Sequence, residues 1–310
     1  MTTLKANLLL LLAAAIWGFA FVAQRLGMAH VGPHTFNAIR FGLGALSLLP
    51  LIHVTRARRE HNASLGRLVA GGVVLGIALF AAASTQQIGL VTTTAGKAGF
   101  ITGLYVVLVP LLALAWGERA SWITWLGALL AVAGLYFLSV TEHMTLSPGD
   151  AWVLLSAFLW AVQIQLVARL TRTIDALPLA AAEFAVCSGL SWIATWVTGE
   201  PITSSGLQGA FLPILYGGLM SVGVAFTLQV VSQRHAKPTP AAIIMSLESA
   251  FAALGGWLLL DERLGPRGAL GAALMMAGMV LAQIKLDRRQ ASGSSNAAPM
   301  LPQPGDPLHP

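Results

Sequence analysis

The sequence predicts an all-α polytopic membrane protein in which ten transmembrane helices form two inverted five-helix repeats. Three observations lead to this prediction. First, 56% of the 310 residues are hydrophobic and only 10% are charged, whereas a soluble domain carries about 25% charged residues. Second, apolar windows of about 20 residues, the length that spans a bilayer, recur along the chain. Third, the second half of the chain repeats a pattern found in the first half.

Ten apolar windows are long enough to span a membrane, and short connections between them make neighbouring helices antiparallel. The first window runs on from Leu8 to Val22, which is longer than the apolar part of a cleaved signal peptide, so we expect a retained helix. The windows are approximately residues 5–24, 33–54, 67–87, 92–116, 121–140, 150–170, 178–198, 209–233, 239–260 and 264–285.

The repeat is clearest where an apolar run with one isolated charge is followed by a charged break and a second apolar run. This pattern occupies residues 92–134 and returns in residues 237–278. Glu118 aligns with Glu262 in the two breaks, and GALLAVAG in the first segment aligns with GAALMMAG in the second. Two matched features in one register indicate a duplicated unit.

Five helices per unit is an odd number, so the second unit enters the membrane from the opposite side. Many secondary transporters use such an inverted repeat for alternating access. We expect the first repeat in residues 1–140 and the second in residues 150–286. Residues 287–310 are rich in Pro, Ser and Gly, which predicts a disordered cytoplasmic tail.

Basic residues predict the orientation, because Lys and Arg concentrate in cytoplasmic loops. With the N-terminus inside, most of the 18 Lys and Arg residues fall on the inner side, and only Arg25, Arg263 and Arg267 fall outside. We therefore expect both termini in the cytoplasm. The net charge of +6 then comes from basic residues in these loops. We expect the lipid bilayer as a partner and no nucleic acid.

Motifs for catalysis and metal binding are missing from the sequence. It contains no GxSxG, HExxH, Walker or GxGxxG pattern, so we expect no enzyme and no catalytic residues. No Cys/His cluster indicates a metal site, and no cofactor is expected. The single cysteine, Cys187, lies in an apolar window and cannot form an intrachain disulfide.

The chain resembles the EamA family of bacterial permeases in the drug/metabolite transporter superfamily. The resemblance covers residues 5–285 and is carried by the duplicated unit, the pair Arg40-Phe41, and FITGLYVVLVPLLALAWGER with its counterpart SLESAFAALGGWLLLDERLG. The first half keeps the proline and the Gly-Glu break typical of the family. The second half departs from that pattern, with Ser249 where proline is frequent and Asp261 in place of the glycine.

This resemblance implies a ten-helix carrier with a central cavity between its halves, while helices five and ten lie at the periphery. Family members move small solutes, often amino acids or other metabolites, and often outward. The resemblance therefore implies a secondary active exporter of a small polar metabolite, such as an amino acid, in a bacterial inner membrane. We also expect that the protein can form a homodimer. An intramembrane enzyme or a lipid-handling protein is the alternative, and a passive channel is a weaker one.

Glu248 is the first candidate for a role in transport. It lies about nine residues into the ninth window, roughly 13 Å deep, and charges at such depth usually face a cavity or a partner. A carboxyl group there can exchange a proton. The alternative is a structural carboxylate paired with a cation or a backbone donor.

Two cations also lie within predicted helices. Lys97 sits among glycines in the fourth window and is a candidate for substrate contact or for pairing with Glu248, although its long stem can also reach the outer interface. Arg40 in the second window can clamp a carboxylate or form a structural pair. Glu183 is expected as an interfacial charge. With Arg40 and Lys97 on one side and two glutamates on the other, the pattern suits an amino-acid zwitterion.

Aromatic and amide side chains complete the candidate set. Trp17 and Trp160 match when the first and sixth windows are overlaid, and they can stack on a substrate, although packing is the simpler role. Gln86 is a candidate for substrate contact among amides that mostly hydrogen-bond between helices. The other intramembrane amides are Asn37, Gln87, Gln163, Gln165 and Gln229.

Overall fold

The computed structural model describes most of the chain as helices. It describes residues 1–55, 63–93, 95–115, 117, 121–139, 147–233, 235–236 and 238–260, and scattered residues between 266 and 281. Eight helical stretches in this part are long and apolar enough to cross a membrane, and two shorter apolar helices, Trp125–Gly134 and Ala269–Gly278, accompany them. The predicted all-α polytopic class is confirmed, while the tail 287–310 and the break glutamates lie outside the described residues.

The helices of the second half follow those of the first about 144 residues later, the offset between Glu118 and Glu262. Thus α7 and α8 correspond to α1 and α2. The first half contains α1 (Thr3–Gly27), α2 (Pro33–Thr55), α3 (Leu65–Thr92), α4 (Ala95–Gly103), α5 (Tyr105–Ala115) and α6 (Trp122–Ser139). The second contains α7 (Pro148–Leu170), α8 (Ala176–Thr198), α9 (Ser204–Gly209), α10 (Phe211–Leu215), η2 (Tyr216–Phe226), α11 (Thr227–Gln233), α12 (Pro238–Met245) and α13 (Glu248–Leu260).

The fourth spanning helix of each half is broken near its middle, where the sequence predicts continuous helices. In the first half the chain turns at Leu104, whose N–H donates to the carbonyl of Ile101 at 3.2 Å. In the second half Leu247 N–H donates to Ile244 at 3.2 Å. Both bonds span three residues instead of four, which tightens and interrupts the helix. The breaks occupy matching places, because Leu247 follows Leu104 by 143 residues, within one residue of the offset between the halves.

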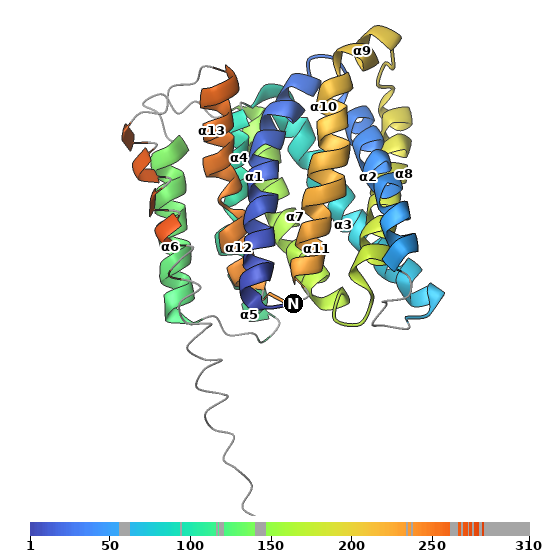
Figure 1. Cartoon of the computed structure of the whole chain (residues 1–310). Helices are drawn as coiled ribbons and strands as arrows, with labels where there is room; N and C mark the ends of the chain where they lie inside the picture. Colours follow the sequence, from blue (N-terminus) through green and yellow to red (C-terminus); the bar gives the residue numbers. More distant parts are fainter. Residues whose placement is uncertain are drawn as a thin grey trace, which may run out of the picture.

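The two broken helices run in opposite directions. Figure 1 shows α4 above α5 but α12 below α13, so the chain descends through the first pair and ascends through the second. This arrangement agrees with the predicted inversion of the two halves.

The helix that follows α9 contains a long π-helical segment, η2, between α10 and α11. A π-helix widens the backbone and usually marks a functional site. Glycines allow η2 to lie directly against α2: a Cβ added at Gly44 would lie 2.2 Å from Val222, and one at Gly218 would lie 2.7 Å from Leu43. The sequence window 209–233 predicts an ordinary helix and misses this feature.

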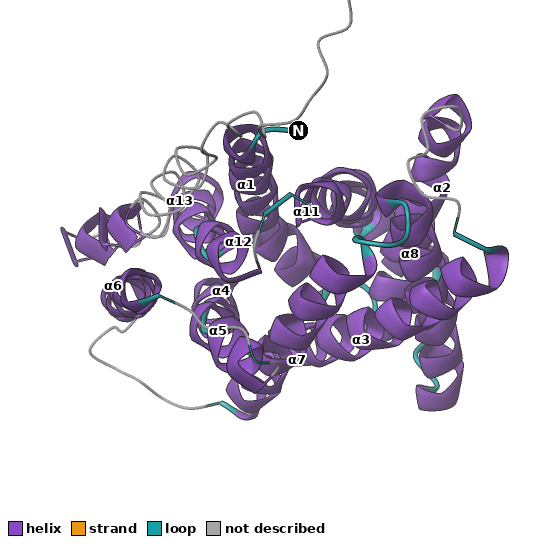
Figure 2. Ribbon diagram, turned by 90° about the horizontal axis from the view of Figure 1, so that it is seen from below, coloured by secondary structure: helices purple, strands orange, loops and turns teal. Residues whose placement is uncertain are grey.

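The fifth helix of the first repeat, α6, lies at the edge of the bundle, away from α1, α7 and α11 (Figure 2). The duplicated GALLAVAG and GAALMMAG runs meet there, since a Cβ added at Gly278 would lie 2.5 Å from the carbonyl oxygen of Gly127. Small residues commonly allow such close approach between membrane helices. The repeated motif therefore joins the two peripheral helices.

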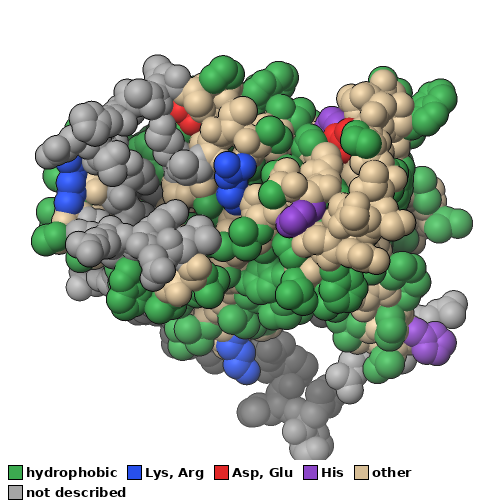
Figure 3. Space-filling model, turned by 90° about the horizontal axis from the view of Figure 1, so that it is seen from above, with side chains coloured by type: hydrophobic (Ala, Val, Ile, Leu, Met, Phe, Trp, Pro, Cys, Tyr) green, Lys and Arg blue, Asp and Glu red, His purple; other side chains and the backbone are tan. Residues whose placement is uncertain are grey.

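A glutamate joins the ends of α2 and α8. Glu200 accepts hydrogen bonds from the backbone N–H groups of His34 at 3.0 Å and Thr35 at 2.7 Å, and from the Thr35 hydroxyl at 2.7 Å. A carboxylate is favoured at a helix N-terminus. Figure 3 views one end of the bundle. Where that surface is coloured, the charged side chains are isolated among hydrophobic and uncharged ones.

Candidate functional site

A pocket lies between the two halves of the bundle. Its empty volume is about 470 Å³, and its lining residues divide equally between the halves. A pocket with an aromatic lining and a few convergent polar groups is typical of small-molecule sites. Five of the six candidate residues line it, namely Trp17, Arg40, Gln86, Trp160 and Glu248.

Glu248 reaches the pocket because of the helix break. It is the first residue of α13, where the helix dipole favours a negative side chain. The residue is 5% exposed, and within the described part of the chain Oε1 of its carboxyl group has no hydrogen-bond partner. Tyr105, the first residue of α5, lies beside this carboxyl group. The two helix breaks therefore bring Glu248 and Tyr105 together.

Arg40 enters the pocket from α2 and is 2% exposed. Its Nε donates to Oδ1 of Asn37 at 2.9 Å, and its guanidinium lies 4.7 Å from the ring centre of Phe41 and 5.6 Å from that of Phe36. No carboxylate among the described residues forms an ion pair with it. The structural ion pair considered for Arg40 is therefore not found there, and its remaining N–H groups are available to a ligand.

Three aromatic side chains form one wall of the pocket. The Phe226 ring lies between the two tryptophans, 4.7 Å from Trp17 and 5.6 Å from Trp160 between ring centroids. Trp17 Nε1 donates to the carbonyl of Ser221 in η2 at 3.2 Å. Trp160 Nε1 has no partner among the described residues. The matched tryptophans of the two halves thus meet at one site, held by the π-helical segment.

Gln86 donates a hydrogen bond from its Nε2 to the hydroxyl of Thr102 at 3.0 Å. Lys97 is part of α4, but its side chain lies outside the described residues, so its proposed pairing with Glu248 stays a prediction. Glu183 is buried among the helices, and its depth at the membrane interface stays a prediction. This residue is 0% exposed and accepts a hydrogen bond from Gln163 at 2.8 Å, because α7 packs over it.

Several lining residues escape prediction from the sequence, among them Gln24, Thr102, Tyr105, Ser221 and Gln229. The sequence gives one indication that Tyr105 lies near the site, because it follows Leu104, the position that aligns with Glu248. Gln229 was expected only to bridge helices. Its place in the pocket depends on the preceding η2 segment, whose wider turn the sequence pattern does not reveal.

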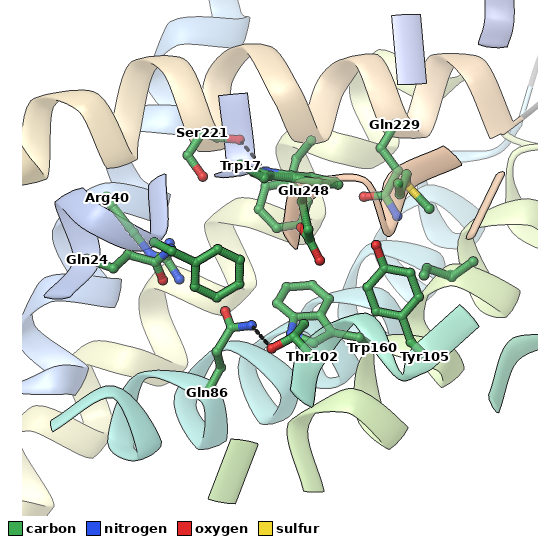
Figure 4. A pocket seen from close by; sticks show the side chains of 14 residues that line it. Trp17, Gln24, Arg40, Gln86, Thr102, Tyr105, Trp160, Ser221, Gln229 and Glu248 are labelled. Carbon is green, nitrogen blue, oxygen red and sulfur yellow. Dashed lines mark hydrogen bonds between the residues drawn. The ribbon is translucent and has the colours of Figure 1, made fainter. Parts of the chain in front are cut away.

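The polar groups are spread along the pocket (Figure 4). Arg40 and Gln24 lie at one end, Tyr105 and Gln229 at the other, and Glu248 between them. An anionic group can therefore bind at Arg40 while a cationic group of the same molecule approaches Glu248. Within the described part of the chain, no three His, Cys, Asp or Glu residues form a group that could hold a metal ion.

Comparison with known proteins agrees with this architecture. The model of the EamA-like transporter family matches residues 4–140 and 147–283. An uncharacterized transporter of Archaeoglobus fulgidus is 30% identical over 91% of this chain and 87% of its own length. A chloroplastic WAT1-related protein of Arabidopsis thaliana is 26% identical over 86% of this chain and 66% of its own.

A crystal structure that is 19% identical superposes with a TM-score of 0.73, covering 92% of this chain and 98% of the other, which shows the shared fold. The family match spans nearly all of both halves, and the pocket lies where those halves meet. The chain belongs to the EamA-like transporter family.

Proposed function

We propose that this protein is a secondary active transporter that exports a small polar metabolite, such as an amino acid, by alternating access about the central pocket. The observation that carries the proposal is the pair of buried charged groups, Arg40 and Glu248, that line one pocket without an ion-pair partner among the described residues. Charged groups inside the membrane are costly and usually mark substrate or ion pathways.

An amino-acid zwitterion complements this arrangement. Its carboxylate accepts hydrogen bonds from the Arg40 guanidinium, whose planar fork matches a carboxylate. Its ammonium group lies against the Glu248 carboxylate. The aromatic wall of Trp17, Trp160 and Phe226 excludes water and contacts the carbon skeleton. The substrate thereby supplies an oppositely charged partner to Arg40 and to Glu248.

Alternating access follows from the inverted halves. The two broken helices cross the middle of the bundle in opposite directions, as discontinuous helices do at the binding sites of many transporters. Rocking one half against the other opens the pocket to each side in turn. Glu248 couples the movement to a proton, which binds when the ammonium group leaves. Outward transport is the direction that resemblance to the family favours.

We also propose that the chain lies in the bacterial inner membrane with both termini in the cytoplasm. The concentration of Lys and Arg in the loops assigned to the inner side supports this orientation. A homodimer is compatible with it. The protein is proposed to have no enzymatic activity, since Glu248 is the only carboxylate among the described residues that line the pocket. Paired acid–base catalysis needs two groups within direct or one-water reach.

The test uses purified protein in proteoliposomes. A panel of L-amino acids is first screened by thermal shift, because a ligand that binds the folded state raises its apparent stability. Transport of the hits is then compared between the wild type and Glu248→Gln across a range of pH. We expect the variant to lose the pH dependence and most of the net transport. Normal transport with unchanged pH dependence would refute the coupling role.

A further inference from the structure

We infer that Glu183 is a positioning residue that sets which hydrogen-bonding group the pocket presents at its Gln229 end, and that this end selects a substrate carrying an additional hydrogen-bond donor. The inference rests on the proposed function and extends it from a zwitterion to a zwitterion whose side chain ends in an O–H or N–H group. It depends on a chain of three buried polar side chains, Glu183, Gln163 and Gln229.

The three side chains form one connected path from α8 to the pocket. Gln163 Nε2 donates to Glu183 Oε1 at 2.8 Å, and Gln229 Nε2 donates to Gln163 Oε1 at 3.2 Å. All three residues are at most 1% exposed, so water does not compete for these bonds. Only Gln229 lines the pocket.

The two hydrogen bonds run in one direction, which an ionised Glu183 enforces. A carboxylate only accepts hydrogen bonds, so Gln163 must turn its NH₂ group toward Glu183. Its carbonyl oxygen then faces Gln229, which must in turn present its own NH₂ group to Gln163. With Nε2 turned to Gln163, the carbonyl oxygen of Gln229 is the atom left without a hydrogen-bond partner among the described residues. Glu183 therefore makes the pocket end an acceptor although it does not touch the pocket itself.

The Gln229 carbonyl oxygen has no hydrogen-bond partner among the described residues, although it is buried. A buried acceptor left unpaired costs about 1–3 kcal/mol, which corresponds to about 5- to 150-fold in binding. Figure 4 places Gln229 beside Tyr105 at the end away from Arg40. A zwitterion bound at Arg40 and Glu248 thus directs its side chain toward this acceptor, and a donor there satisfies it.

The test compares pairs of ligands in which one member has a side-chain hydrogen-bond donor and the other has a methoxy group in its place. The probes are L-serine with O-methyl-L-serine, and L-glutamine with L-glutamate 5-methyl ester, measured by equilibrium binding to the full-length protein in detergent. Wild-type protein should bind the donor member of at least one pair about tenfold or more tightly. In Glu183→Gln the amide at position 183 can both donate and accept, so it no longer dictates the direction of the hydrogen bonds through Gln163 and Gln229. The preference for the ligand with the donor should then fall to about twofold or less.

A matched control comes from the same helix. Gln165 is also 0% exposed, but its Nε2 donates to the carbonyl of Val109 at 2.9 Å and it does not line the pocket. Gln165→Met removes a buried amide two residues from Gln163 and should keep the full preference. A merely structural role of Glu183 would lower binding of both members of a pair equally and leave their ratio unchanged.

A second variant keeps the inference testable if Glu183→Gln does not fold. Gln229→Met removes the acceptor and should abolish the preference while Arg40 and Glu248 still hold the zwitterion. Preference that survives either variant overturns the inference, as does a wild type that binds the probes without preference. If no zwitterion binds the wild type at all, the proposed function itself is refuted and the inference falls with it.

Discussion

Replacing Arg40 with methionine separates the function of this residue from the stability of the fold. The guanidinium is buried without a described carboxylate partner, so Arg40→Met removes a desolvated charge and keeps most of the packing volume. Replacing buried charges by apolar side chains of similar size is often neutral or stabilising. The loss of the Asn37 hydrogen bond opposes this by about 1 kcal/mol. We therefore expect an unchanged or raised melting temperature.

Binding should respond in the opposite way. Hydrogen bonds from a charged donor contribute about 1.5–3 kcal/mol, so losing the clamp should weaken binding of an amino acid about 10- to 150-fold. Isothermal titration calorimetry compares the amino acid from the panel that binds most tightly with the amine that its decarboxylation gives. The comparison isolates the contact between Arg40 and the substrate carboxylate. The amine has no carboxylate to lose and should bind the wild type and the variant within about twofold.

The reasoning on Arg40 would be refuted by either of two results. In one, Arg40→Met weakens the amine as much as the amino acid, which would indicate a general collapse of the pocket. In the other, the variant unfolds at a clearly lower temperature, which would show that the residue serves the fold. Arg40→Lys is the matched control, since it keeps the charge but loses the planar fork and should recover only part of the affinity.

Three further predictions concern contacts between helices. Gly18→Ala should lower both melting temperature and transport, because the added Cβ would lie 2.7 Å from the Glu248 carbonyl oxygen in α13; wild-type values for both would contradict the close contact. Glu200→Gln should lower the free energy of unfolding by about 1–2 kcal/mol in reversible unfolding while affinity for the substrate stays constant, since the carboxylate caps α2 and does not line the pocket; an unchanged free energy of unfolding would count against the cap. Trp17→Phe should lower the free energy of unfolding by about 1 kcal/mol, because it loses the hydrogen bond from Nε1 to the carbonyl of Ser221. An unchanged melting temperature would count against that bond.

The class of the fold could be predicted from the sequence because hydropathy responds directly to the bilayer. Apolar windows and the register between Glu118 and Glu262 depend only on residue type and spacing. The helix breaks at Leu104 and Leu247 and the π-helical segment η2 could not be predicted in this way. They change the direction or width of the backbone within a continuous apolar run, where the hydropathy pattern stays the same.

The same distinction applies to the site. Arg40 and Glu248 were found because an isolated charge in an apolar window is conspicuous, and their shared pocket follows from packing between the halves. The hydrogen-bond partners of Gln229 and Glu183 could not be predicted, because an amide or carboxylate within a helix gives no sign of its partner. Their roles depend on α7 placing Gln163 between α8 and α11, which is a tertiary contact.

Counterflow in proteoliposomes tests the central claim most directly. Vesicles that contain purified protein are loaded with an unlabelled amino acid from the panel and diluted into a trace of the same labelled compound. A carrier with one alternating site predicts saturable uptake that is accelerated by internal substrate and reduced at least tenfold in Arg40→Met. Uptake that rises linearly with concentration and is indifferent to internal substrate would contradict alternating access and indicate a channel.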